Sequence, residues 1–153
     1  MKGFCGGIMP RVSAAFFAMG LLCLFFGGAI GMHMASGGNA AYAGMHVHLN
    51  LVGWATMALC GTFYALTPTT LSPRLAWINF WVLTAGIVVF FPAYAIFLAD
   101  GNDPRLGPVM TVGNGLTGLG MLIFAVSVGR ELLRKRSHAQ NHSKPAVMSG
   151  SPG

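Results

Sequence analysis

Four long apolar runs divide the chain, at about 12–34, 46–67, 75–99 and 108–129. A membrane-spanning α-helix needs about 20 mostly apolar residues, and each run is long enough. The segments between the runs contain the residues that end helices: Ser36-Gly37-Gly38-Asn39, Thr67-Pro68 and Asp100-Gly101-Asn102-Asp103-Pro104. The pattern predicts an all-α fold, with a four-helix transmembrane bundle in residues 1–130 and a basic, disordered tail in residues 131–153.

Composition agrees with a membrane protein. Hydrophobic residues make up 54% of the chain and charged residues 8%, whereas soluble domains carry about 25% charged residues. A soluble enzyme is therefore excluded. The acidic residues are Asp100, Asp103 and Glu131, and all three lie outside the apolar runs. Their positions argue against a relay of carboxylates inside the membrane.

The positive charges predict the orientation of the bundle. Lys2 and Arg11 precede the first run, Arg74 lies between the second and third, and a basic segment follows the fourth. Cytoplasmic flanks of membrane helices are enriched in Lys and Arg. We therefore expect both termini in the cytoplasm of a bacterial cell, with the protein in the inner membrane. The net charge of +6 then reflects contact with anionic lipid, not with nucleic acid.

Three histidines are predicted to gather at one edge of the bilayer. His33 ends the first run, whereas His46 and His48 open the second. An ionisable side chain at membrane depth is a candidate functional residue. Neutral imidazole binds haem iron, copper and zinc. Flanking Met32, Met34 and Met45 offer thioethers that would favour Cu(I), or they simply fill apolar space.

Spacing limits how two of these histidines can act. Residues two apart on an α-helix point about 200° away from each other. If both are helical, His46 and His48 cannot bind one ion from the same face. Either His46 precedes the helix, or the two histidines serve different sites. Asn50 follows His46 by four residues, so we expect it to help orient that ring.

Small and polar residues predict how the helices pack. Gly20, Gly27 and Gly31 fall on one stripe of the first run, where they would allow close contact with a second helix or with a flat macrocycle. Asn79 and other polar residues in the runs are expected to form hydrogen bonds across helices. Tyr64, near one edge, is expected to be an aromatic anchor at the membrane interface.

A family resemblance lies in the second run, in the stretches His46-Val47-His48-Leu49-Asn50-Leu51-Val52-Gly53-Trp54 and Gly61-Thr62-Phe63-Tyr64-Ala65-Leu66-Thr67-Pro68. These residues resemble the His-x-His-Leu-Asn-Leu-x-Gly-Trp segment of short bacterial membrane proteins described as cytochrome c oxidase subunit I-like, or cbb3-type subunit I-like. The resemblance covers residues 10–130 roughly and is most specific over 46–68. It implies a relation to the haem–copper oxidases and nitric oxide reductases, whose histidines bind haem b and copper. His46 and His48 match the motif, whereas His33 has no assigned counterpart.

The chain departs from a complete oxidase of that superfamily, which resembles a bundle of about a dozen helices with six histidine ligands. Four runs and three membrane histidines cannot build that double site. We therefore expect a haem b protein for electron transfer or an accessory role in respiration, with His48 as the first ligand and His33 or His46 as the second. A homo-oligomer or a respiratory complex is expected. The alternatives are copper or zinc held by His33, His46 and His48, and a structural or assembly subunit without a cofactor.

Overall fold

The computed structural model describes residues 9–67, 72–101 and 103–142, and within these ranges every regular element is helical. The elements are α1 (Arg11–Ala35), η1 (Ala40–Tyr42), α2 (Ala43–His48), η2 (Leu49–Ala55), α3 (Thr56–Leu66), α4 (Pro73–Ala99), η3 (Pro104–Leu106) and α5 (Gly107–His142). Four segments are long and apolar enough to cross a membrane, namely Arg11–Ala35, Ala40–Leu66, Pro73–Ala99 and Pro104–Arg134. The predicted all-α class is confirmed, and each of the four predicted runs falls in a helical segment long and apolar enough to cross a membrane.

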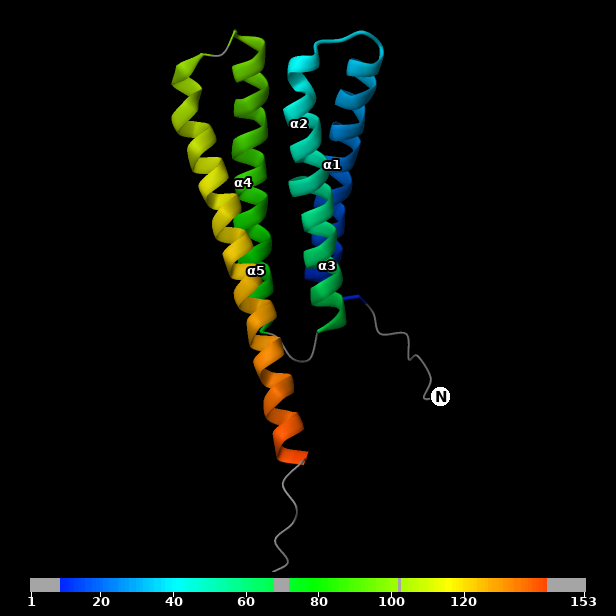
Figure 1. Ribbon diagram of the computed structural model, residues 1–153, viewed down its shortest axis with the longest axis vertical. Coiled ribbons are helices and arrows are strands. Elements are labelled where there is room, and N and C mark those ends of the chain that lie inside the picture. The colour runs from blue at the N-terminus through cyan, green and yellow to red at the C-terminus, as the bar shows by residue number, and fades with distance from the viewer. Residues whose placement is uncertain (1–8, 68–71, 102, 143–153) are drawn as a thin grey trace, which may run out of the picture.

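The four spans form two helical hairpins that lie side by side (Figure 1). In the first, α1 packs against the continuous segment α2–η2–α3, and in the second, α4 packs against α5. The connections after α1 and after α4 lie at the same end of the bundle (Figure 1). We call this end the histidine end, because it holds His33, His46 and His48. We call the opposite end, which holds Arg11, Arg74 and Arg134, the arginine end.

Glycines allow the two helical segments of the first hairpin to pack closely. A Cβ atom added to Gly20 would lie 3.2 Å from Trp54 and 3.3 Å from Met57, and one added to Gly27 would lie 2.7 Å from the amide nitrogen of Asn50. The glycine stripe of α1 therefore faces the second span, as the spacing predicts. Its surface is covered by side chains of the chain itself, which supports helix packing over contact with a macrocycle.

Glycines also allow close packing in the second hairpin, between α4 and α5. A Cβ added to Gly113 would lie 2.7 Å from the backbone nitrogen of Phe90, and one added to Gly120 would lie 2.5 Å from Leu83. On the same helix, Gly115 and Gly118 have no heavy atom within 4 Å of the added Cβ. Gly113 and Gly120 therefore make the contact with α4, whereas Gly115 and Gly118 lie on the outer face of α5.

The second span contains a π-helical segment, η2, between the short α2 and α3. Thr56, which follows η2, donates both its backbone N–H and its hydroxyl to the carbonyl oxygen of Leu51, five residues earlier. Such widened turns are rare and occur frequently at functional sites. This one lies directly after the two histidines of α2.

Helix α5 extends past the end of its predicted span, to His142. Residues 131–142, which the sequence pattern assigns to a disordered tail, are therefore helical, whereas residues 143–153 lie outside the described part of the chain. The physical reason lies in residues such as Glu131, Leu132 and Arg134, which have high helix propensity. Glu131 and Arg134 also form an ion pair one turn apart, with a nitrogen–oxygen distance of 3.4 Å.

Burial is uneven along the bundle. The largest side chains that are less than 2% exposed all lie in the half nearer the arginine end: Phe16, Met57, Leu83, Asn79, Cys60, Ser13 and Ser127. The other half buries fewer side chains, and these are 2–6% exposed: Cys23, Leu49, Ile87, Phe91 and Ala93. The histidine end is therefore the less tightly filled end of the molecule.

Candidate functional site

His46 lies half-buried between α2 and α1. Its Nδ1 atom is 2.7 Å from the carbonyl oxygen of Gly27. Because a carbonyl oxygen can only accept, Nδ1 carries the proton and Nε2 holds the lone pair. A Cβ added to Gly31 would lie 2.8 Å from Cε1 of this ring. The glycine stripe of α1 thus makes the space in which the imidazole lies.

Asn50 supports this arrangement. Its amide nitrogen donates to the carbonyl oxygen of His46 at 2.8 Å and lies 3.4 Å from Nδ1 of the same residue. Since Nδ1 donates to Gly27, the second contact is one of packing. Asn50 therefore fixes the helical turn that carries His46 and fills the space beside Gly27. This is the neighbourhood that its four-residue spacing from His46 predicts.

His48 faces a different helix. Its ring is exposed and its centroid lies 6.4 Å from that of Phe90 on α4. Its Nδ1 donates to the carbonyl oxygen of Gly44 at 2.8 Å, which again leaves the lone pair on Nε2. The Tyr94 hydroxyl oxygen lies 2.8 Å from where a Cβ of Gly44 would be. Both histidines lie in α2, so His46 does not precede the helix. The two rings have different neighbours, His46 on α1 and His48 on α4.

His33 has a third environment, in the last turn of α1. The ring is exposed, and its centroid lies 6.4 Å from that of Tyr42, in an edge-to-face arrangement. The carbonyl oxygen of His33 accepts from the hydroxyl of Ser36 and from the N–H of Gly38. A shallow pocket of about 310 Å³ lies beside the ring, between α1 and the connection to α2, and it is lined by Phe26, Ala29, Ile30, His33 and Tyr42.

The structure thus places the three histidines at one end of the bundle but gives each its own neighbours. Within residues 9–67, 72–101 and 103–142, no group of three or more His, Cys, Asp or Glu residues is arranged to bind one metal ion. Among the methionines, Met32 is 71% exposed and Met45 packs against the core. The shared three-histidine site and the thioether ligands stay predictions.

A buried polar network lies at the arginine end. The amide nitrogen of Asn79 donates to the Tyr64 hydroxyl at 3.0 Å. The hydroxyl oxygens of Tyr64 and Ser127 are also 3.0 Å apart, and Ser127 bonds the carbonyl oxygen of Ile123 at 3.1 Å. An amide N–H only donates and a carbonyl only accepts, so the donors run from Asn79 through Tyr64 and Ser127 to Ile123. This chain joins α4, α3 and α5.

Tyr64 was expected to be an interface anchor, and this expectation is wrong, because the residue is only 3% exposed. Two further polar atoms in this region, Oδ1 of Asn79 and Oγ of Ser13, are buried without a hydrogen-bond partner among the described residues. The sequence shows these polar residues in apolar runs, but their spacing within single runs does not reveal that they meet across helices.

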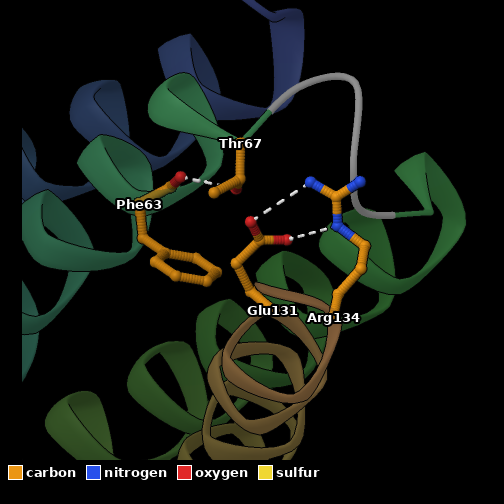
Figure 2. Close-up of polar contacts among 4 residues, drawn as sticks. All are labelled: Phe63, Thr67, Glu131 and Arg134. Atoms are coloured by element: carbon orange, nitrogen blue, oxygen red, sulfur yellow. Dashed lines mark hydrogen bonds and ion pairs between the residues drawn. The ribbon is translucent and has the colours of Figure 1, made fainter. Parts of the chain in front are cut away.

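Glu131 is the functional candidate that sequence reasoning missed. It follows the last apolar run, yet it is only 7% exposed. Its carboxylate lies 3.4 Å and 3.5 Å from the Nε and Nη2 atoms of Arg134 (Figure 2). The signal available in the sequence is its position four residues after Ser127, which puts both residues on one face of α5.

No protein-family model, curated protein or solved structure matches this chain. The resemblance to the oxidase subunit I-like proteins therefore stays a prediction, and function has to be argued from the geometry of the residues.

Proposed function

We propose that this chain is a multi-pass membrane protein that binds haem b at the histidine end through His48, and that it serves in electron transfer or as an accessory to respiration. The observation that supports this proposal is the hydrogen bond from Nδ1 of His48 to the carbonyl oxygen of Gly44. A hydrogen bond from Nδ1 to a backbone carbonyl fixes the tautomer and the orientation of an imidazole and leaves Nε2 as the ligand atom.

The residues around His48 fit this role. The imidazole is exposed, so Nε2 can be reached without unfolding the helix. Phe90 and Tyr94 place aromatic rings on the facing part of α4, and aromatic and apolar walls keep water from a haem and thereby tune its potential. A bound haem b supplies one-electron oxidation and reduction of its iron. The chain's part would be to hold the group through His48 and to limit the access of water to it.

His33 or His46 of the same chain, or a histidine of a second copy of the chain, would hold the haem together with His48. His33 is exposed, whereas His46 is half-buried, bonded to the carbonyl oxygen of Gly27 and packed against Gly31. We therefore place His46 in a supporting role, because its ring could bind iron only if α1 moved away from it. Because this chain offers four candidate spans and these ligands, we propose an electron-transfer or accessory role and not that of a complete oxidase.

The location of the protein is argued in two steps, first that it is a membrane protein and then which membrane it occupies. Four helices long and apolar enough to cross a membrane indicate a multi-pass membrane protein. The finer proposal is the inner membrane of a bacterium, with both termini in the cytoplasm. It is supported by the cations at the arginine end, Arg11, Arg74, Arg130 and Arg134, because cytoplasmic flanks are enriched in such residues.

The test is a reduced-minus-oxidised absorption spectrum of the full chain, purified in detergent after expression with haem and copper supplied, together with metal analysis. We expect a b-type spectrum that His48→Ala abolishes and His46→Ala retains at reduced protein stability. Stoichiometric copper without haem would support the metal-handling alternative. The absence of both cofactors from correctly folded protein would overturn the proposal in favour of a structural subunit.

A further inference from the structure

The arginine end carries a pocket that is independent of the histidines. Its volume is about 310 Å³, and it lies between the end of α3 and the α5 segment beside it. The lining residues are Phe63, Leu66, Thr67, Val128, Glu131 and Leu132. Four of them are apolar, so a carboxylate and a hydroxyl are the polar side-chain groups of an otherwise hydrophobic wall.

The carboxylate is held in an unusual way. The side chain of Glu131 is 8% exposed, whereas that of its partner Arg134 is 45% exposed. Two nitrogen–oxygen distances, 3.4 Å and 3.5 Å, join the carboxylate to the guanidinium. Figure 2 shows the carboxylate between the Arg134 guanidinium and the ring of Phe63. The pocket thus presents a buried negative charge next to a half-exposed positive one.

The pocket lies where a membrane surface would meet the bundle. Leu66, near the end of the second span, is 78% exposed, and Leu132 is 59% exposed. Arg74 and Arg134 lie at the same end of the helices. In a bilayer, leucines so exposed contact acyl chains, and arginines at helix ends reach the headgroup layer. The walls therefore suit a lipid tail, and the charged pair lies level with its headgroup.

We propose that this pocket binds a phospholipid with a primary ammonium headgroup, that is, phosphatidylethanolamine. Its ammonium donates to Glu131 and lies against the ring of Phe63, which attracts cations. Its phosphate accepts from Arg134, and one acyl chain passes Val128 toward the middle of the bilayer. The zwitterion matches both charges of the pair without changing the net charge of the site.

The same chemistry predicts selectivity among phospholipids. Phosphatidylcholine has no N–H donor for the carboxylate, and phosphatidylglycerol has no cation at all. A hydrogen bond to a charged group contributes about 1.5 kcal/mol or more, which corresponds to about tenfold in binding. Phosphatidylethanolamine should therefore bind about tenfold more tightly than either competitor with the same acyl chains.

The experiment is native mass spectrometry of the full chain in detergent, with the three phospholipids added at equal concentration and with identical acyl chains. We expect the wild-type protein to retain phosphatidylethanolamine about tenfold over the others. Glu131→Gln should bring the three lipids to near parity, whereas Asp103→Asn, which removes a carboxylate at the opposite end, should leave the preference unchanged. Arg134→Gln should lower the retention of all three lipids.

Fold and binding are separated by recording size-exclusion profiles and thermal unfolding for each variant. The wild-type preference needs no variant, so equal retention of the three lipids by the wild-type protein would overturn the proposal. A full preference retained in folded Glu131→Gln would overturn it as well.

Leu132→Trp provides a second test if Glu131→Gln fails to fold. The tryptophan fills the pocket from an exposed position and should reduce retention of phosphatidylethanolamine at least fivefold. Unchanged retention would overturn the proposed site. The result does not depend on haem, so it is distinct from the test of His48.

Discussion

The two ends of the bundle are joined in different ways. At the arginine end, large rings bridge the hairpins: Phe16 on α1 lies 5.2 Å from Phe80 on α4, and Phe63 on α3 lies 5.3 Å from Phe124 on α5, between ring centroids. The network of Asn79, Tyr64 and Ser127 links three helices at the same level. At the histidine end, the hairpins meet where Tyr94 approaches Gly44 and where His48 faces Phe90.

This difference indicates that the arginine end stabilises the bundle, whereas the histidine end is available for binding. Filled aromatic layers and satisfied hydrogen bonds hold the helices of a membrane protein together, because lipid gives no hydrophobic drive for their association. The arginine end has aromatic layers and the network of Asn79, Tyr64 and Ser127, which outweigh the buried Asn79 Oδ1 and Ser13 Oγ that have no partner among the described residues. The histidine end has exposed imidazoles and fewer buried side chains, so a guest or a second copy can bind there at little cost in packing. The following substitutions test that contrast.

The largest effect is expected from Phe16→Ala, because this side chain is fully buried against Tyr64 and Phe80. The cavity left behind should lower the free energy of unfolding by about 3 kcal/mol. Phe26→Ala is the matched control at the histidine end, where the ring is 64% exposed, and it should change stability by less than about 0.5 kcal/mol. Denaturant unfolding in detergent measures both, and equal losses would refute the contrast.

His46 and His48 should separate stability from binding. His46→Phe loses the hydrogen bond to Gly27 and should destabilise the protein by about 1 kcal/mol. His48→Phe changes an exposed ring, so its stability should stay within about 0.5 kcal/mol of the wild type while the haem spectrum disappears. Unfolding curves and haem spectra of the two variants provide the comparison. If His46→Phe lost the haem spectrum and His48→Phe lost stability, His46 would be the ligand and His48 the packing residue.

The polar network should show coupling between helices. Tyr64→Phe and Ser127→Ala each remove one of two hydroxyls that lie 3.0 Å apart. Hydrogen bonds between membrane helices contribute about 0.6 kcal/mol on average in double-mutant cycles. We expect a coupling of that size from the two single variants and the double variant, measured by unfolding. Independent effects of the two substitutions would mean that the network does not join α3 to α5.

The last comparison is between two glycines of α1 that are three residues apart. Gly28 has open space where a Cβ would be, so Gly28→Ala should be neutral or stabilising by up to about 1 kcal/mol through helix propensity. Gly31→Ala would place a methyl group 2.8 Å from the His46 ring. It should therefore be less stable than Gly28→Ala by about 1 kcal/mol. Thermal unfolding of the pair is sufficient, and equal stability would remove the support that α1 gives to His46.

Much of the fold could be predicted because lipid imposes simple rules on sequence. Apolar length predicts the spans, and the glycine stripe of α1 predicts the face that packs. What the pattern could not supply is how residues from different runs meet. Nothing near Tyr64 in the sequence indicates a bond to Ser127, and nothing near Glu131 indicates that the end of α3 covers it.

The candidate site was predictable to the same extent. Histidines at the ends of adjacent runs indicate a common edge, and the two-residue spacing indicates that His46 and His48 diverge. The hydrogen-bond partners of the rings could not be predicted, because the acceptors are backbone carbonyl oxygens of glycines, and a glycine has no side chain that indicates such a bond. Gly27 is nineteen residues from His46, and only the packing of α1 on the second span brings them together.

The π-helical segment η2 gives the second span one residue more than a regular helix with the same number of turns. A widened turn accommodates one residue more than an α-helical turn, so deleting one residue from Leu49–Ala55 would restore a regular helix. Because the widened turn itself takes up the extra residue, that deletion would leave His46 beside α1 and His48 beside α4. Deleting one residue from a regular α-helical part of the same span would instead turn the histidines by about 100° around the helix axis relative to α3. The segment η2 is therefore the place in the second span where a codon can be lost without changing which neighbours the imidazoles meet.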